Sequence, residues 1–281
     1  MAAEILCWLA GLLLLSGCAV WRTELPARVA LLASFEGRYR EVGYNAFYAV
    51  RLALADAALE IEFLPVDDGG TAESAQQRAR ALAVDPQVRA VLLLGYHAAA
   101  AETQLALDDL PAIVVGHWSA QPARAGVFML AAQALDTLIT APARIDVTDA
   151  AELASPVTGG DVFALAQFPL LRDRLDGVTI VSSARLPDAD FAARYRASAQ
   201  FAPAPGLLAM LAYDAAALAL QVTDANTTRA QVSQRLGAVR YEGLNGLITF
   251  ENGYWADAPI YYYAYDQRRL LAPVDRVIEQ R

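Results

Sequence analysis

The sequence predicts an α/β protein built around a doubly wound parallel sheet, followed by a second, weaker α/β region. Apolar runs of strand length alternate with segments of helical periodicity as far as residue 120. One of these runs, residues 88–95, is almost continuously apolar, which is typical of a strand covered on both faces. No short-period repeat or low-complexity linker interrupts the pattern.

The elements of the first region follow one another in a regular order. The expected strands are residues 28–35, 59–68, 88–95 and 111–116, and the helices between them are residues 41–58, 71–85 and 98–109. In the first helix Phe47, Val50 and Leu54 recur at spacings of three and four residues, which places them on one face. Repeated strand–helix units of this kind form a parallel sheet.

The second region gives shorter and less regular signals. Strands are expected at residues 143–149, 161–167 and 177–183, with a short helix at residues 168–175. Two apolar periodic segments predict helices at residues 205–223 and 228–239. The final part of the chain predicts antiparallel strands around a turn at Asn252-Gly253.

Composition narrows the class of function. The chain has 281 residues, of which 56% are hydrophobic and 19% charged, so it is globular with ample core. The formal charge of −9 argues against a nucleic-acid partner, because phosphate backbones are bound by clustered Lys and Arg. The motifs G-x-S-x-G, P-loop and strand-linked G-x-G-x-x-G are absent, so neither an enzyme nor a cofactor is predicted.

The N-terminus carries the most specific signal. An apolar run too short to span a bilayer as a mature helix ends in Leu15-Ser16-Gly17-Cys18. This quartet resembles the lipobox of bacterial lipoproteins, in which the Cys is lipidated and begins the mature chain. The resemblance implies a signal peptide at residues 1–17, a lipidated tether at residues 18–26, and an extracytoplasmic protein anchored in a membrane through Cys18. The alternative is a buried helix in which Cys18 is simply apolar.

Cysteine usage agrees with this interpretation. Cys7 would leave with the signal peptide and Cys18 would carry the lipid, so the mature body has no cysteine for a disulfide or for thiol chemistry. The only histidines are His97 and His117, and no third ligand stands at motif spacing from them. We therefore expect no metal site.

Four stretches of the sequence carry motifs that occur in a characteristic order. They are VALLASFEGRYREVGYNAFYAVRLALADA (29–57), VDDGGTAESAQQRARALAVDPQVRAVLLLG (66–95), YDAAALAL (213–220) and GLNGLITFENGYW (243–255). In this order they resemble the type 1 periplasmic binding proteins of the branched-chain amino acid and amide class. The resemblance covers roughly residues 28–120 and 203–265.

The resemblance implies two lobes joined by three crossovers, with a ligand held between them. Lobe one would comprise residues 27–122 and 206–257, and lobe two residues 123–205 and 258–281. Lobe two is short for this family, since one or two β-α units are missing between Ala132 and Thr158. The expected fold is therefore α/β with two doubly wound parallel-sheet lobes, the second of them reduced.

Both histidines follow a glycine that ends a predicted strand. In an open parallel sheet ligands bind beyond the carboxyl ends of the strands, so His97 and His117 are expected on the rim of the interlobe cleft. A plainer alternative is that each His only caps a helix or bonds to a neighbouring loop. The predicted ligand-binding residues are Tyr39, Gly95, Tyr96, His97, Gly116, His117, Trp118 and Ser119.

The function implied by the resemblance is that of a solute-binding lipoprotein. It would deliver a small polar solute, amino-acid-like or amide-like, to the permease subunits of an ABC importer. Residues 98–101 are all Ala where the family places a hydroxyl for the ligand carboxylate, so a weaker carboxylate grip or a different ligand is expected. Two alternatives stay open, namely a sensing or interaction module that has lost or changed its ligand, and an α/β enzyme without a recognisable motif.

Overall fold

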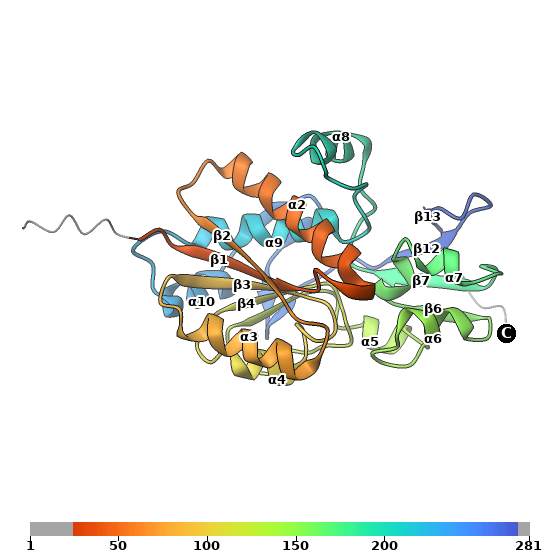
Figure 1. The fold of residues 1–281 in the computed structure, drawn as a ribbon, viewed down its shortest axis with the longest axis horizontal. Helices are drawn as coiled ribbons and strands as arrows, with labels where there is room; N and C mark the ends of the chain where they lie inside the picture. Colours follow the sequence, from red (N-terminus) through yellow and green to blue (C-terminus); the bar gives the residue numbers. More distant parts are fainter. Residues whose placement is uncertain (1–24, 275–281) are drawn as a thin grey trace, which may run out of the picture.

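The computed structural model describes residues 25–274, so the signal peptide, Cys18 and most of the tether lie outside the described residues. The described chain forms two lobes that lie side by side along the long axis of the molecule (Figure 1). A seven-stranded sheet forms the centre of lobe one, and a four-stranded sheet forms lobe two. The predicted two-lobed α/β architecture is therefore confirmed.

The sheet of lobe one is mainly parallel and deeply buried. Its strand order is β10-β11-β5-β4-β3-β1-β2. The strands are β1 (Arg28–Ala33), β2 (Glu62–Asp67), β3 (Val88–Leu94), β4 (Ala112–Val115), β5 (Val127–Leu130), β10 (Phe250–Glu251) and β11 (Tyr254–Trp255). Every residue of β4 and nearly every residue of β1 and β3 is buried, because helices cover both faces of the sheet.

Helices cover both faces of this sheet. Figure 1 shows α2 (Arg40–Ala57) and α9 (Ala209–Val222) over one face and α3 (Ala72–Val84) and α4 (Ala101–Ala106) over the other. Helix α10 (Arg229–Gly237) packs against α9 and β3. The short hairpin of β8 (Tyr241–Gly243) and β9 (Gly246–Ile248) follows α10.

The turn at Asn252-Gly253 joins β10 to β11 as predicted. Its two central residues have φ angles of 52° and 82°. A two-residue hairpin turn of type I′ needs positive φ at both positions, and Asn followed by Gly meets this need with little strain.

Lobe two differs from the expected parallel sheet in its strand directions. The strand order is β13-β12-β7-β6, built from β6 (Val157–Gly159), β7 (Val178–Ser182), β12 (Tyr261–Tyr265) and β13 (Leu271–Pro273). Only β6 and β7 pair in parallel, and β12 runs antiparallel to both of its neighbours. The helical segments are α5 (Leu135–Leu138), α6 (Val147–Glu152), the 3-10 helix η2 (Asp161–Ala164) and α7 (Phe168–Leu171).

Two predicted strands of lobe two are wrong. Residues 143–146 form a loop and residues 147–149 begin α6, because the Asp146 side chain accepts a hydrogen bond from the Thr148 amide at 2.9 Å and caps the helix. Residues 161–167 begin with η2 instead of a strand. The Asp161 carboxylate turns inward there and bonds to buried groups of both lobes, so this segment lies outside the sheet ladder.

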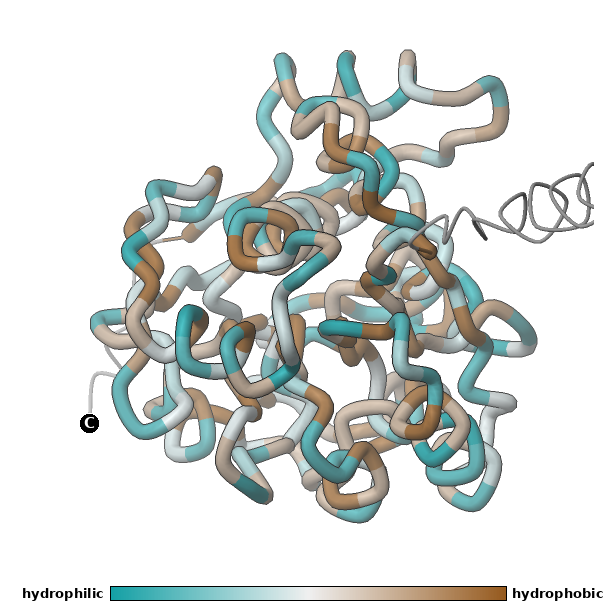
Figure 2. The backbone as a smooth tube through the Cα atoms, turned by 90° about the vertical axis from the view of Figure 1, so that its left-hand side faces the viewer, coloured by the Kyte–Doolittle hydropathy of each residue, from teal (hydrophilic) through white to brown (hydrophobic). Residues whose placement is uncertain are grey.

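Helix α8 (Ala189–Ala197) falls in the range expected for lobe two but packs on lobe one. The Tyr195 hydroxyl donates to the main-chain oxygen of Asn45 at 3.0 Å, and Arg194 pairs with Asp56, so both contacts join α8 to α2. The α8 region stands above α2 (Figure 1). Figure 2 shows the backbone turned by 90° about the vertical axis and coloured by residue hydropathy. These contacts tie α8 to lobe one.

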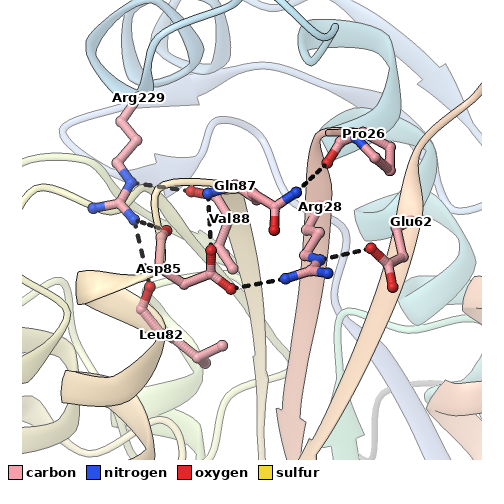
Figure 3. A network of polar contacts seen from close by, with 8 residues as sticks. All are labelled: Pro26, Arg28, Glu62, Leu82, Asp85, Gln87, Val88 and Arg229. Carbon is pink, nitrogen blue, oxygen red and sulfur yellow. Dashed lines mark hydrogen bonds and ion pairs between the residues drawn. The ribbon is translucent and has the colours of Figure 1, made fainter. Parts of the chain in front are cut away.

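A polar network fixes the end of lobe one where the chain enters the fold (Figure 3). Arg28 bonds to Asp85 at 3.1 Å, and the Gln87 side chain donates to the main-chain oxygen of Pro26 at 3.5 Å. Arg229 donates to main-chain oxygens at the end of α3 and the start of β3. The chain thus enters lobe one at the amino edge of the sheet, away from the carboxyl ends of its strands.

Gly43 allows α2 to lie close to the end of β1. A Cβ at this position would stand 2.1 Å from the carbonyl oxygen of Ser34, a backbone atom that cannot move without displacing the strand end. An exposed helical Gly→Ala change normally stabilises by about 1 kcal/mol. We expect Gly43→Ala instead to lower the free energy of unfolding by about 2–3 kcal/mol, because overpacking outweighs helix propensity.

Urea denaturation measures this change. The control is Ala55→Gly at an exposed position of the same helix, which should lose only about 1 kcal/mol. A Gly43→Ala variant as stable as the wild type would contradict the close packing of α2 on β1.

Candidate functional site

The carboxyl ends of the lobe-one strands meet lobe two. The strands run parallel in register, with Ala33 opposite Leu94 and Leu93 opposite Val114. His97 follows β3 and His117 follows β4, so both lie at the same edge of the sheet. This is the edge at which open α/β sheets bind ligands.

His117 joins the two lobes through its main chain and its ring. Its amide donates to Oδ2 of Asp161 at 2.8 Å, and its Nε2 lies 2.7 Å from Oδ1 of Asp136 in α5. Its Nδ1 accepts from the Ser119 amide at 3.3 Å, so Nε2 carries the proton and donates to Asp136. The ring is buried and has a partner at each nitrogen, which resembles the plainer alternative of a His bonded to neighbouring loops.

Asp161 is the buried carboxylate at the joint between the lobes. It is 4% exposed, and its second oxygen accepts from the Ser182 hydroxyl at 2.7 Å. Burial raises the pKa of Asp161, while the hydrogen bonds from His117 and Ser182 oppose the rise. Gly116 makes the contact possible, because a Cβ there would stand 2.7 Å from Oδ2 of Asp161 and the backbone has a φ of 89°.

Sequence reasoning missed Asp161 because it placed this residue in a strand. The Gly159-Gly160 pair directly before it is the local signal that favours a turn at this point. The partners of Asp161 come from the end of β4 and from β7, so only the folded chain brings them together.

Tyr39 closes one side of the cleft. Its hydroxyl donates to Oδ2 of Asp146 at 3.1 Å and accepts from the Val147 amide at 3.0 Å, while Arg38 forms an ion pair with the same Asp146. Burial raises the pKa of Tyr39 to about 12, so the hydroxyl is neutral at physiological pH. Burial also opposes ionisation of Asp146, but hydrogen bonds from Thr148, Arg38 and Tyr39 outweigh it and lower its pKa.

Tyr96, Trp118 and Ser119 form the lobe-one wall of the cleft. The rings of Tyr96 and Trp118 meet edge to face with centroids 5.4 Å apart, and the Trp118 ring nitrogen donates to the Val115 carbonyl. The Arg144 guanidinium donates to the Tyr96 carbonyl at 3.2 Å, and the Arg144 amide donates to the Ser119 hydroxyl at 3.4 Å. The Tyr96 carbonyl and the Ser119 hydroxyl are therefore already bonded to lobe two.

His97 and Gly95 stand apart from this group. The main-chain oxygen of His97 accepts from the Thr103 hydroxyl at 2.7 Å. Burial raises the pKa of Asp68, and His97 is among the neighbours that partly oppose the rise. The structure thus places His97 beside the ends of β2 and β3, outside the lining of the interlobe cavity.

The interlobe cavity itself is small. Its volume is about 20 Å³, room for about one water molecule, whereas ligand pockets commonly measure ~300–1,000 Å³. A second cavity of about 20 Å³ lies on the other side of Asp161, beneath the start of α2. The first cavity is lined by Tyr96, His117, Trp118, Ser119, Ile139, Ala141, Pro142, Ile145, Gly160, Asp161, Val162 and Phe163.

The described residues contain no group that could bind a metal ion and no helix that could span a membrane. Within residues 25–274 no group of His, Cys, Asp and Glu side chains could hold a metal ion. Over the same range no helix has the length and apolar character to cross a membrane.

The structure is similar to several solved solute-binding proteins. The substrate-binding protein LivJ of a Streptococcus pneumoniae branched-chain amino acid transporter, in complex with isoleucine, aligns with a TM-score of 0.67 at 14% identity, over 89% of this chain and all of that chain. The leucine-binding protein LivK from Thermotoga maritima aligns with a TM-score of 0.65 at 11% identity, over 89% of this chain and 98% of that chain.

A third structure binds a different ligand. It is the solute-binding protein of an R. palustris ABC transporter in complex with benzoate, with a TM-score of 0.66 and 13% identity over 89% of this chain and 96% of that chain. The chain has the fold of the type 1 periplasmic binding proteins. The predicted resemblance is thereby confirmed at the level of fold, and the similar structures are solute-binding proteins rather than enzymes. No family model and no curated protein matches the sequence.

Asp161 gives a direct test of the joint between the lobes. Asp161→Ala leaves the buried His117 amide without its acceptor and removes the partner of the Ser182 hydroxyl. We expect it to lower the free energy of unfolding by about 3 kcal/mol. Asp161→Asn should cost about 1 kcal/mol or less, because its oxygen can accept from His117 and its amide can donate to Ser182.

Thermal and urea denaturation of both variants would measure this difference. Equal losses for the Ala and Asn variants would show that the hydrogen bonds of Asp161 do not hold the joint.

Proposed function

We propose that this protein is an extracytoplasmic lipoprotein that binds a small polar solute between its lobes and delivers it to the permease of an ABC importer. The observation that carries the proposal is the meeting of Asp161 with the strand-end loops of lobe one, between two lobes of this fold. A buried carboxylate beside an aromatic wall matches the usual character of a solute site, which is largely apolar with a few placed polar groups.

The chemistry of the site favours an amino-acid-like or amide-like solute. Each Asp161 oxygen holds one hydrogen bond, and a carboxylate offers about four acceptor sites, so capacity remains for an ammonium or amide N–H. Tyr96 and Trp118 would contact the apolar part of the solute. The hydroxyl-free run Ala98–Ala101 contributes nothing to a carboxylate, so the affinity should be nearer micromolar than nanomolar, roughly −8 instead of −12 kcal/mol.

One observation favours a second candidate function. Side chains of the protein itself fill most of the space between the lobes and leave a cavity of only about 20 Å³. A sensing or interaction module that has lost its solute would have such a cleft, because its closed form would be complete without a ligand.

A solute screen tests these two functions against each other. Thermal shift with amino acids, amides, urea and small carboxylates, followed by calorimetry, should identify a ligand, which adds about 2.7 kcal/mol of stability at 100 times its Kd. Asp161→Asn should weaken binding about tenfold, the equivalent of ~1.4 kcal/mol. The control Asp176→Asn, at an exposed position of lobe two, should leave binding unchanged.

The absence of any response in this screen would contradict the transport proposal and favour the interaction module. Unchanged binding in Asp161→Asn would place the solute elsewhere on the molecule.

The anchor has its own test. We expect the mature chain to begin at a diacylated Cys18, so mass spectrometry of the membrane fraction should find a lipid-modified N-terminal peptide. Cys18→Ala should move the protein out of that fraction, because one acylated residue supplies both chains of the anchor. An intact Met1 on unmodified protein would contradict the lipoprotein proposal.

A further inference from the structure

The chain between the start of α5 and the start of α6 runs through the interlobe site. We call residues 136–147 the cleft segment. We propose that the cleft segment is a built-in occupant of the solute site, which holds the lobes closed and must be displaced before a solute can enter. The solute part of this inference rests on the proposed function, whereas the closure part stands on the contacts alone.

The first support is that the cleft segment bonds to the polar groups predicted to hold a ligand. The Tyr39 hydroxyl bonds to Asp146 and to the Val147 amide at 3.1 and 3.0 Å. The His117 ring bonds to Asp136 at 2.7 Å. A solute would have to compete for these groups, since each hydrogen bond already formed must be broken or shared.

Arg144 extends this pattern to the other wall of the cleft. Its amide bonds to the Ser119 hydroxyl at 3.4 Å, and its guanidinium bonds to the Tyr96 carbonyl at 3.2 Å. One residue of lobe two thus presents an N–H group and a positive charge to two predicted ligand-binding positions. These are the kinds of group that a polar solute would present there.

The apolar side of the site is filled in the same way. Ala141 and Ile145 are each 8% exposed and belong to the same buried cluster as Trp118, with Tyr96 and Ile139 packed against it. Ile139, Ala141 and Ile145 also line the cavity of about 20 Å³. The cleft segment therefore belongs to a hydrophobic core that both lobes share, which favours the closed arrangement without a solute.

Backbone strain gathers at the same contact. Trp118, Ser119 and Arg144 have φ angles of 46°, 49° and 56°, in the left-handed region that non-glycine residues rarely adopt. Such conformations persist when surrounding contacts hold them, and they cluster at ligand clamps and switch regions. Release of the cleft segment would free residues on both sides of the contact to relax.

This arrangement lowers the apparent affinity for any interlobe solute. When only a fraction of the molecules is open, the apparent Kd equals the intrinsic Kd divided by that fraction. Loss of contacts on the cleft segment should therefore raise both the open population and the affinity. Asp136 and Asp146 are suitable targets, because neither lines the interlobe cavity.

Electron–electron distance measurements on spin labels test the closure. Labels at Glu102→Cys in α4 and Glu152→Cys in α6 report on the two lobes, since both positions are exposed. The full chain has Cys7 and Cys18 as its only cysteines, so both are replaced by Ser. The test variants are Asp136→Ala/Asp146→Ala and, as a change that leaves the cap of α6 intact, Tyr39→Phe. The control is Asp176→Asn.

The wild type and the control should show mainly the short distance, with a minor longer-distance population. In the double variant this longer-distance population should be about tenfold larger than in the wild type, as expected for the loss of charge-assisted hydrogen bonds, and in Tyr39→Phe it should grow by a smaller factor. Distance distributions identical to the wild type in both variants would overturn the inference. So would a wild type that is already mainly open.

Calorimetry separates this inference from the proposed function. Any solute found by the screen should bind the double variant about tenfold more tightly than the wild type, and equal affinity would overturn the competition between segment and solute. If no solute binds either protein, the proposed function fails, and the distance measurements alone decide whether the cleft segment closes the lobes.

Discussion

The joint between the lobes depends on the buried carboxylate of Asp161. An unpaired buried charge would cost several kcal/mol, so this residue is tolerated only where its partners are fixed. The His117 amide and the Ser182 hydroxyl supply these partners, and Gly116 leaves the space for the carboxylate to approach. This contact holds the loop after β4 and the start of η2 together. Asp161 then lines the small cavities on both of its sides.

Lobe one could be predicted because its signals are local and strong. Strands β1, β3 and β4 are covered on both faces and therefore appear as apolar runs, and parallel strands must end at a common edge. That rule alone placed His97 and His117 at one edge of the sheet. The turn at Asn252-Gly253 could be predicted because positive φ at two adjacent positions calls for these residue types.

Lobe two and the contents of the cleft depend on contacts that no local pattern encodes. Strands β6 and β13 have only three residues each, too few for alternation to be recognised, whereas the five-residue β7 lies within the predicted range 177–183. The docking of α8 rests on a bond between Tyr195 and Asn45, which lie 150 positions apart. Likewise, Tyr39 could be placed near the cleft from sequence, but its partner Asp146 lies 107 positions further along the chain.

The absence of strands between β5 and β6 and the filled cleft have a common physical origin. The chain from the end of β5 to the start of β6 forms no strand and only the short helices α5 and α6, so it adds no β-α unit to the outer side of lobe two. It crosses the joint instead and carries Ile139, Ala141 and Ile145 into the space between the lobes. Apolar surface buried there contributes about 25 cal/mol per Å² towards closure, whether or not a solute is present. Here the chain itself completes the contact between the lobes. Any solute must therefore bind strongly enough to replace contacts that the protein already makes with itself.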